Sequence, residues 1–138
     1  MPAPEFLDTN VLVYAYDPGD SNKQRIAQDL VRRALAGEIL VSTQVLAEFA
    51  ATLLHKLKPA ARPKDVAAVL DALSPIGVVV PDADIVRRAL DARAEYGVHF
   101  YDGMIVAAAE RGGCGRIWSE DLNAGQKYFG IAVENPFR

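Results

Sequence analysis

The sequence predicts an α/β fold in which a central, mostly parallel sheet of about five strands is covered by helices in three layers. Short apolar runs alternate along the chain with longer segments whose apolar residues recur at helical spacing. Strands that are apolar throughout are typical of a parallel sheet buried on both faces. With 138 residues and 51% hydrophobic content, the chain can build one sizeable core, so we expect a single domain, residues 1–138.

The strands are expected where the short apolar runs lie. The first ends near Asp8, and the others cover residues 39–41, 78–80, 116–118 and 131–133. After the first strand, the S-x-x-Q pattern of residues 21–24 predicts a capping box that begins a helix, and Gly37 ends it. The buried face of this helix is expected to consist of Ile26, Leu30, Val31 and Leu35.

Four further helices follow from apolar spacing and capping signals. One runs from Ser42 to about Leu57, and a second opens at Pro63, which suits a first turn. A third is capped by Asp82 or Asp84, ends at Gly97, and carries Ile85, Val86, Ala89 and Leu90. The last begins near Tyr101, while residues 123–128 are expected to form a loop or a short helix.

Charge and composition exclude several classes of protein. A net charge of -3 argues against a protein that coats nucleic acid by bulk electrostatics. One basic stretch consists of Lys56, Lys58, Arg62 and Lys64, and it could either face phosphates or be a solvated helix end. No apolar run approaches the roughly 20 residues of a membrane span, and the first residues lack the order of a secretory signal, so we expect a cytoplasmic protein. The single cysteine, Cys114, is interpreted as a small loop residue.

Four carboxylates stand at the boundaries of predicted elements beside apolar residues. Asp8 and Asp121 follow strands, Glu48 lies less than two turns into a helix, and Asp102 begins a helix. In parallel α/β folds, ligands bind beyond the carboxyl ends of the strands. All four acids can therefore converge at that edge.

A cluster of carboxylates points to a hard metal ion. Like charges raise one another's pKa unless cations enter, and oxygen ligands without histidine favour Mg²⁺ or Mn²⁺ over zinc. Neither His55 nor His99 has ligand spacing to another histidine or to cysteine, so we interpret both as structural or surface residues. The sequence contains no phosphate-binding G-x-x-x-x-G-K-[ST] loop.

Each acid also has a purely structural interpretation. Asp8 can form an Asx turn after its strand, and Asp102 can cap its helix. Glu48 can be a solvated flank of its helix, and Glu120 competes with Asp121 within a polar turn. Spacing alone leaves these alternatives open.

Four segments carry a resemblance to a known family. They are the acid-containing stretches Asp8-Thr9-Asn10-Val11-Leu12, Gln44-Val45-Leu46-Ala47-Glu48-Phe49, Tyr101-Asp102-Gly103-Met104-Ile105-Val106-Ala107-Ala108-Ala109 and Ser119-Glu120-Asp121-Leu122. In order and spacing over nearly the whole chain, they resemble PIN-domain proteins, and most of all the VapC-like toxins of bacterial and archaeal toxin–antitoxin pairs.

The resemblance implies a metal-dependent endoribonuclease that uses Mg²⁺ or Mn²⁺. Its acidic site would consist of Asp8, Glu48, Asp102 and Asp121, with Thr9, Asn10 and Ser119 in support and with Glu120 as a substitute for, or addition to, Asp121. The expected partners are an RNA substrate, a small antitoxin protein and a second copy of the chain. No association with a membrane is expected.

Two other functions are consistent with the same residues. A catalytically silent binding module could use the acids to hold a partner's arginine or a structural cation. A haloacid-dehalogenase-like phosphatase could use Asp8 as nucleophile, but such enzymes need a second acid two residues later, where this chain has Asn10.

Overall fold

A computed structural model describes residues 2–138 as six helices and six strands. The strands are β1 (Glu5–Leu7), β2 (Ile39–Ser42), β3 (Val78–Val79), β4 (Arg116–Trp118), β5 (Lys127–Tyr128) and β6 (Ile131–Glu134). The helices are α1 (Thr9–Tyr14), α2 (Ser21–Leu35), α3 (Thr43–His55), α4 (Pro63–Ala72), α5 (Ala83–Tyr96) and α6 (Phe100–Arg111). The predicted α/β class is therefore confirmed.

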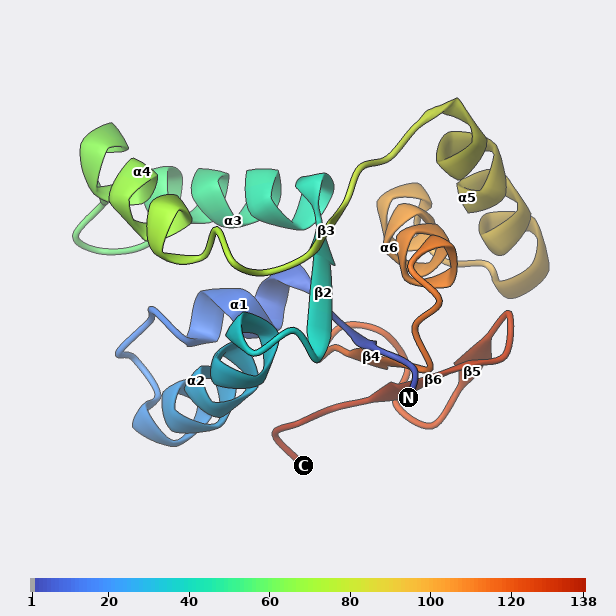
Figure 1. The fold of residues 1–138 in the computed structure, drawn as a ribbon, viewed down its shortest axis with the longest axis horizontal. Helices are drawn as coiled ribbons and strands as arrows, with labels where there is room; N and C mark the ends of the chain where they lie inside the picture. The colour runs from blue at the N-terminus through green and yellow to red at the C-terminus, as the bar shows by residue number, and fades with distance from the viewer. Residues whose placement is uncertain (1) are drawn as a thin grey trace.

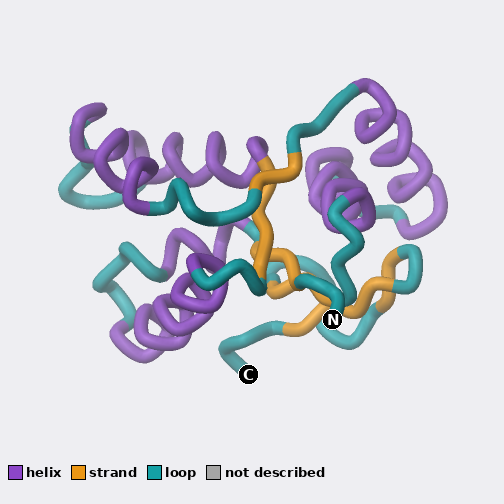
Figure 2. The backbone as a smooth tube through the Cα atoms, viewed as in Figure 1, coloured by secondary structure: helices purple, strands orange, loops and turns teal. Residues whose placement is uncertain are grey.

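The strands form one mostly parallel sheet in the order β3-β2-β1-β4-β6-β5, in which only β5 runs antiparallel to its neighbour. Helices α5 and α6 lie on one side of the twisted sheet, and α1 and α2 lie on the other, with α3 and α4 beyond α1 (Figure 1). Figure 2 shows the strands as a narrow central layer between the helices. In the described part of the chain, no helix combines the length and apolar character needed to cross a membrane.

The central strands are short because polar residues follow each of them directly. Phe6, Leu7, Val41 and Ile117 are completely buried, as expected for strands covered on both faces. Asp8 follows β1 and Ser119 follows β4, and the backbone N–H of Asp8 donates to the carbonyl of Trp118 over 3.0 Å. The parallel pairing of β1 with β4 thus brings these two strand ends to the same edge of the sheet.

Two elements were not predicted from the sequence. Residues 9–14 form α1, a helix that was not among those expected from the sequence. Its start is stabilised by Asp8, which accepts a hydrogen bond from the Thr9 backbone N–H. Residues 127–128 form β5, a sixth strand, where we expected a loop or a short helix. Its antiparallel pairing with β6 supplies the backbone partners that make so short a strand possible.

The start and the buried face of α2 also differ from the prediction. The N-cap is Asp20, whose carboxylate accepts from the backbone N–H groups of Asn22 and Lys23, so the predicted capping box at Ser21 is wrong. The side chain of Leu35 is 38% exposed, and the core is instead closed by Ala27 and Ala34. Close approach to the sheet favours these small residues.

Helix α5 shows the same displacement of its buried face. Ile85 and Ala89 are buried as predicted, but Val86 and Leu90 are 42% and 55% exposed. The helix packs chiefly against α6, on which Gly103 lies against the backbone of Ala89. Asp82 caps α5 and Gly97 ends it at a φ of 71°, both as predicted.

Candidate functional site

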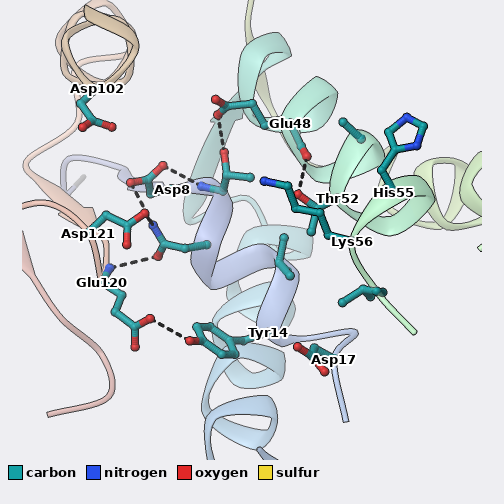
Figure 3. A pocket seen from close by; sticks show the side chains of 15 residues that line it. Asp8, Tyr14, Asp17, Glu48, Thr52, His55, Lys56, Asp102, Glu120 and Asp121 are labelled. Carbon is teal, nitrogen blue, oxygen red and sulfur yellow. Dashed lines mark hydrogen bonds between the residues drawn. The ribbon is translucent and has the colours of Figure 1, made fainter. Parts of the chain in front are cut away.

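All four predicted acids line one pocket of about 730 Å³. Asp8 caps α1, Glu48 lies on α3, Asp102 lies in the first turn of α6, and Asp121 lies in the loop after β4. In Figure 3, Asp102 approaches from α6 and Glu48 from α3, with Asp8 and Asp121 nearby. The convergence expected from the sheet topology is thus present in the structure.

Asp8 is the buried member of this group, with only 4% of its surface exposed. Its Oδ1 accepts from the Thr9 backbone N–H over 2.7 Å. Its Oδ2 accepts from the Ser119 hydroxyl over 2.8 Å and from the Asn10 amide over 3.3 Å. These bonds fix the orientation of the carboxylate from three sides.

The surroundings of Asp8 and Asp102 disfavour the charged forms of these two acids. Burial raises the pKa of Asp8 from 3.8 to about 6, against the opposing effect of its hydrogen bonds from Ser119 and Thr9. The nearby Asp102 and Asp121 make smaller contributions to this rise. The pKa of Asp102 is also raised, mainly by burial and also by Asp121 and Glu48. A cation at this pocket would therefore relieve a real electrostatic cost.

Thr9 and Asn10 connect the acids to one another. The Thr9 hydroxyl donates to Oε1 of Glu48 over 2.7 Å, which joins α1 to α3. The Asn10 amide donates to Asp8 and, over 3.1 Å, to Oδ2 of Asp121, while its carbonyl oxygen accepts from the Glu120 backbone N–H. Thr9 and Asn10 therefore contact three of the four acids directly.

Ser119 is completely buried beneath the same group. Its hydroxyl donates to Asp8 and accepts from the backbone N–H groups of Asp121 and Leu122. The hydroxyl therefore ties the position of one acid to the loop that carries another.

Glu120 and Asp121 point in different directions. Glu120 accepts a hydrogen bond from the Tyr14 hydroxyl over 2.8 Å and forms an ion pair with Lys23. Figure 3 shows its carboxylate directed toward Tyr14 and away from the other acids. Asp121, bonded to Asn10, is therefore the better placed of the two to act with Asp8.

The four acids would offer carboxylate oxygens, which are the ligands that a hard divalent cation prefers. Across residues 2–138, however, no three side chains of the His, Cys, Asp or Glu type are gathered closely enough to hold a metal ion. The residues therefore fit a magnesium or manganese ion by chemistry and by their common pocket, but not by ligand distances.

The structure also places the two histidines, the cysteine and the basic stretch discussed above. His99 caps α6 by accepting from the Tyr101 backbone N–H, as befits a structural residue, whereas His55 lines the pocket. Cys114 is buried, and burial raises the pKa of its thiol to about 11, which is unsuited to a nucleophile. Of the four basic residues singled out in the sequence, Lys56 lines the pocket.

Two residues around the pocket were missed by sequence reasoning. Tyr14 lines it and holds Glu120, and Lys23 completes the same cluster with its ammonium 4.8 Å from the centre of the Tyr14 ring. The helical spacing of Tyr14 from Asn10 could have placed it near the acids, had α1 been predicted. No local pattern marks Lys23, because its contact with Glu120 spans 97 positions.

The PIN domain family model matches residues 6–129, and the chain belongs to this family. Its fold is shared by toxin–antitoxin proteins of known structure. One is a chain of a toxin–antitoxin complex from Klebsiella pneumoniae, with a TM-score of 0.71, 20% identity, and 96% of this chain and 97% of that chain covered.

Two further structures show the same fold at 20% identity. VapC20 of Mycobacterium tuberculosis, a toxin that cleaves the sarcin-ricin loop, has a TM-score of 0.67, with 85% of this chain and 91% of that chain covered. VapBC2 of Rickettsia felis, bound to a DNA fragment from its promoter, has a TM-score of 0.65, with 95% and 97% covered. No curated protein matches the chain.

Proposed function

We propose that this protein is a metal-dependent endoribonuclease and the toxin of a type II toxin–antitoxin pair. The observation that carries the proposal is the convergence of Asp8, Glu48, Asp102 and Asp121 on one pocket. Membership of the PIN family and the likeness in fold to a toxin that cleaves the sarcin-ricin loop support the nuclease assignment.

Asp8, Glu48, Asp102 and Asp121 would hold Mg²⁺ or Mn²⁺. A divalent cation bound there lowers the pKa of water and stabilises charge on the leaving oxygen of a phosphodiester. Ser119, Thr9 and Asn10 position the carboxylate of Asp8, and Asn10 also positions that of Asp121. Because four parts of the fold supply the acids, the site requires the intact tertiary structure.

Asn10 also distinguishes this proposal from an aspartyl-phosphate enzyme. It stands where a haloacid-dehalogenase-like phosphatase needs its second acid, and its amide donates to Asp8 and Asp121. A hydrogen-bond donor at this position cannot accept a proton as a carboxylate would. The geometry thus favours the nuclease over phosphoryl transfer through Asp8.

The proposed inhibitor is a small antitoxin that places an arginine among the acids. Carboxylates whose charged forms are disfavoured by burial bind a guanidinium strongly, and the arginine would compete with metal for the same oxygens. Apolar anchors for its tail were sought among Phe49, Leu53 and Leu54 of α3; Phe49 and Leu53 are buried in the core, and Leu54 is only partly exposed. The pocket instead offers Val13 and Leu57. Undiminished inhibition by an antitoxin without its tail arginines would contradict this mechanism.

We also propose that the chain forms a homodimer. The alanine-rich residues 60–72 are one candidate for the contact. Val86 and Leu90, one turn apart on α5, are another, because both are exposed large apolar side chains. Light scattering at micromolar concentration should give twice the 15.0 kDa mass of the chain, and Leu90→Glu should lower it. A monomeric mass for the unaltered protein would count against the dimer.

The nuclease proposal is tested with purified protein and mixed cellular RNA. Cleavage should occur with Mg²⁺ or Mn²⁺, stop with EDTA, and leave 5′-phosphate and 3′-hydroxyl ends. A folded protein that binds RNA without cutting it under any of these conditions would instead be a catalytically silent binding module.

A further inference from the structure

The pocket continues beyond the acids along α3. Glu48, Thr52 and Lys56 follow one another at intervals of four residues and line the pocket from the same side of α3 and its C-cap. At a rise of 1.5 Å per residue, Glu48 and Lys56 stand about 12 Å apart along the helix axis. Figure 3 shows Lys56 and His55 on the α3 side of the pocket and Asp102 across from them.

The charges around this pocket are strongly unequal. Besides the four convergent acids, Asp17 and Glu120 line it, while Lys56 is the only lysine or arginine among the lining residues. The ion pair with Lys23 offsets the charge of Glu120, but the rest of the lining repels an anionic RNA chain. A metal ion offsets this repulsion at the acids alone, so binding of the flanking RNA needs another cation.

Lys56 is available for this role. Within residues 2–138 it forms no ion pair, whereas Arg62 of the same basic stretch is paired with Asp65. Lys58 and Lys64, the other basic residues of that stretch, do not line the pocket. Lys56 therefore presents three ammonium donors to the pocket without a carboxylate already bound to them.

We propose that Lys56 binds a backbone phosphate of single-stranded RNA next to the scissile one, and so fixes how the strand lies along the pocket. The inference rests on the proposed nuclease function and adds a positioning residue to it. Because a lysine binds a phosphate as a point charge, the contact does not depend on the base sequence.

A purely structural role for Lys56 has a different signature. The residue caps the C-terminus of α3, where a positive charge stabilises the helix dipole. Removing that stabilisation would lower the unfolding temperature and leave the KM for RNA unchanged. Kinetic and stability measurements on the same variants therefore separate the two roles.

The test compares Lys56→Gln, Lys56→Arg and the unaltered protein in Mg²⁺-dependent cleavage of a fluorescent single-stranded oligoribonucleotide. Lys127→Gln is the matched control, because Lys127 lies on β5, outside the pocket, and its loss changes the net charge equally. We expect Lys56→Gln to raise KM about tenfold with kcat within about twofold. The slope of log(1/KM) against log[NaCl] should fall by about 0.7, the value for one phosphate contact on a single strand.

Lys56→Arg should recover most of the lost affinity, and Lys127→Gln should behave like the unaltered protein. A KM and salt slope for Lys56→Gln equal to those of Lys127→Gln would overturn the assignment of Lys56, as would a loss confined to kcat. These results leave the nuclease proposal intact, since the unaltered protein still cleaves. If it does not cleave with Mg²⁺, the nuclease proposal fails and the role of Lys56 fails with it.

Discussion

At the scale of single residues, Asp8 is held in an environment that opposes its charge. Its folded-state pKa of about 6 lies above the ordinary 3.8, so the folded protein binds the proton more tightly than the unfolded chain does. Stability should therefore fall as pH rises through this interval. Between pH 5 and pH 8, without metal, the free energy of unfolding should drop by about 1 kcal/mol on account of Asp8.

Asp8→Asn removes this titration and provides the comparison. In urea denaturation with EDTA at several pH values, the free energy of unfolding of the variant should rise relative to that of the unaltered protein as pH rises. Parallel curves for the two proteins would mean that the Asp8 carboxylate is not strained by burial.

Ser119 links two of the acids through one hydroxyl. Ser119→Ala removes the donor to Asp8 and leaves the backbone N–H groups of Asp121 and Leu122 without that acceptor. Because buried polar groups then lack a hydrogen-bond partner, the free energy of unfolding should fall by about 1 to 3 kcal/mol. Chemical denaturation would measure it, with the exposed Ser74→Ala as control. Equal stability of the two variants would refute the linking role.

At the scale of elements, the position of Asp102 depends on the close packing of α5 against α6. A Cβ on Gly103 would lie 2.7 Å from the carbonyl oxygen of Ala89, a backbone atom that cannot turn aside. Gly103→Ala should therefore push the helices apart, displace Asp102, and reduce the free energy of unfolding by about 1 to 3 kcal/mol.

Gly115→Ala is the matched control, because its Cβ would meet only the side chain of Ala3 at 3.6 Å. Thermal unfolding of both variants measures the difference. A Gly103→Ala protein as stable and as active as Gly115→Ala would show that α5 and α6 can separate without cost.

The elements also show which patterns can be predicted from a sequence. Strands β1, β2 and β4 followed from short apolar runs because their apolar residues pack into the core. Helix α1 could not be distinguished from a continuing apolar stretch, since six residues give too little periodicity. The buried faces of α2 and α5 shifted because alanines made the closest contacts, and apolar spacing alone gives small residues little weight.

At the scale of the whole molecule, the common edge of the sheet was predictable and the direction of each side chain was not. Asp8 and Asp121 follow parallel strands, which is enough to bring them together. The choice between Glu120 and Asp121 depends on Tyr14 and Lys23, which are distant in sequence. Likewise, the burial of Phe49 and Leu53 depends on how α3 packs against α1 and the core.

The most direct test of the central claim is Mg²⁺-dependent RNA cleavage by Asp8→Asn and Asp102→Asn beside Asp71→Asn, an exposed aspartate of α4 outside the pocket. All three proteins should fold, as judged by circular dichroism. Asp71→Asn should cleave at the unaltered rate, and the two pocket variants should lose at least about 100-fold in kcat/KM, as expected when ligands of a catalytic ion are lost. Undiminished cleavage by folded Asp8→Asn or Asp102→Asn, or full activity in EDTA, would contradict the metal-dependent mechanism.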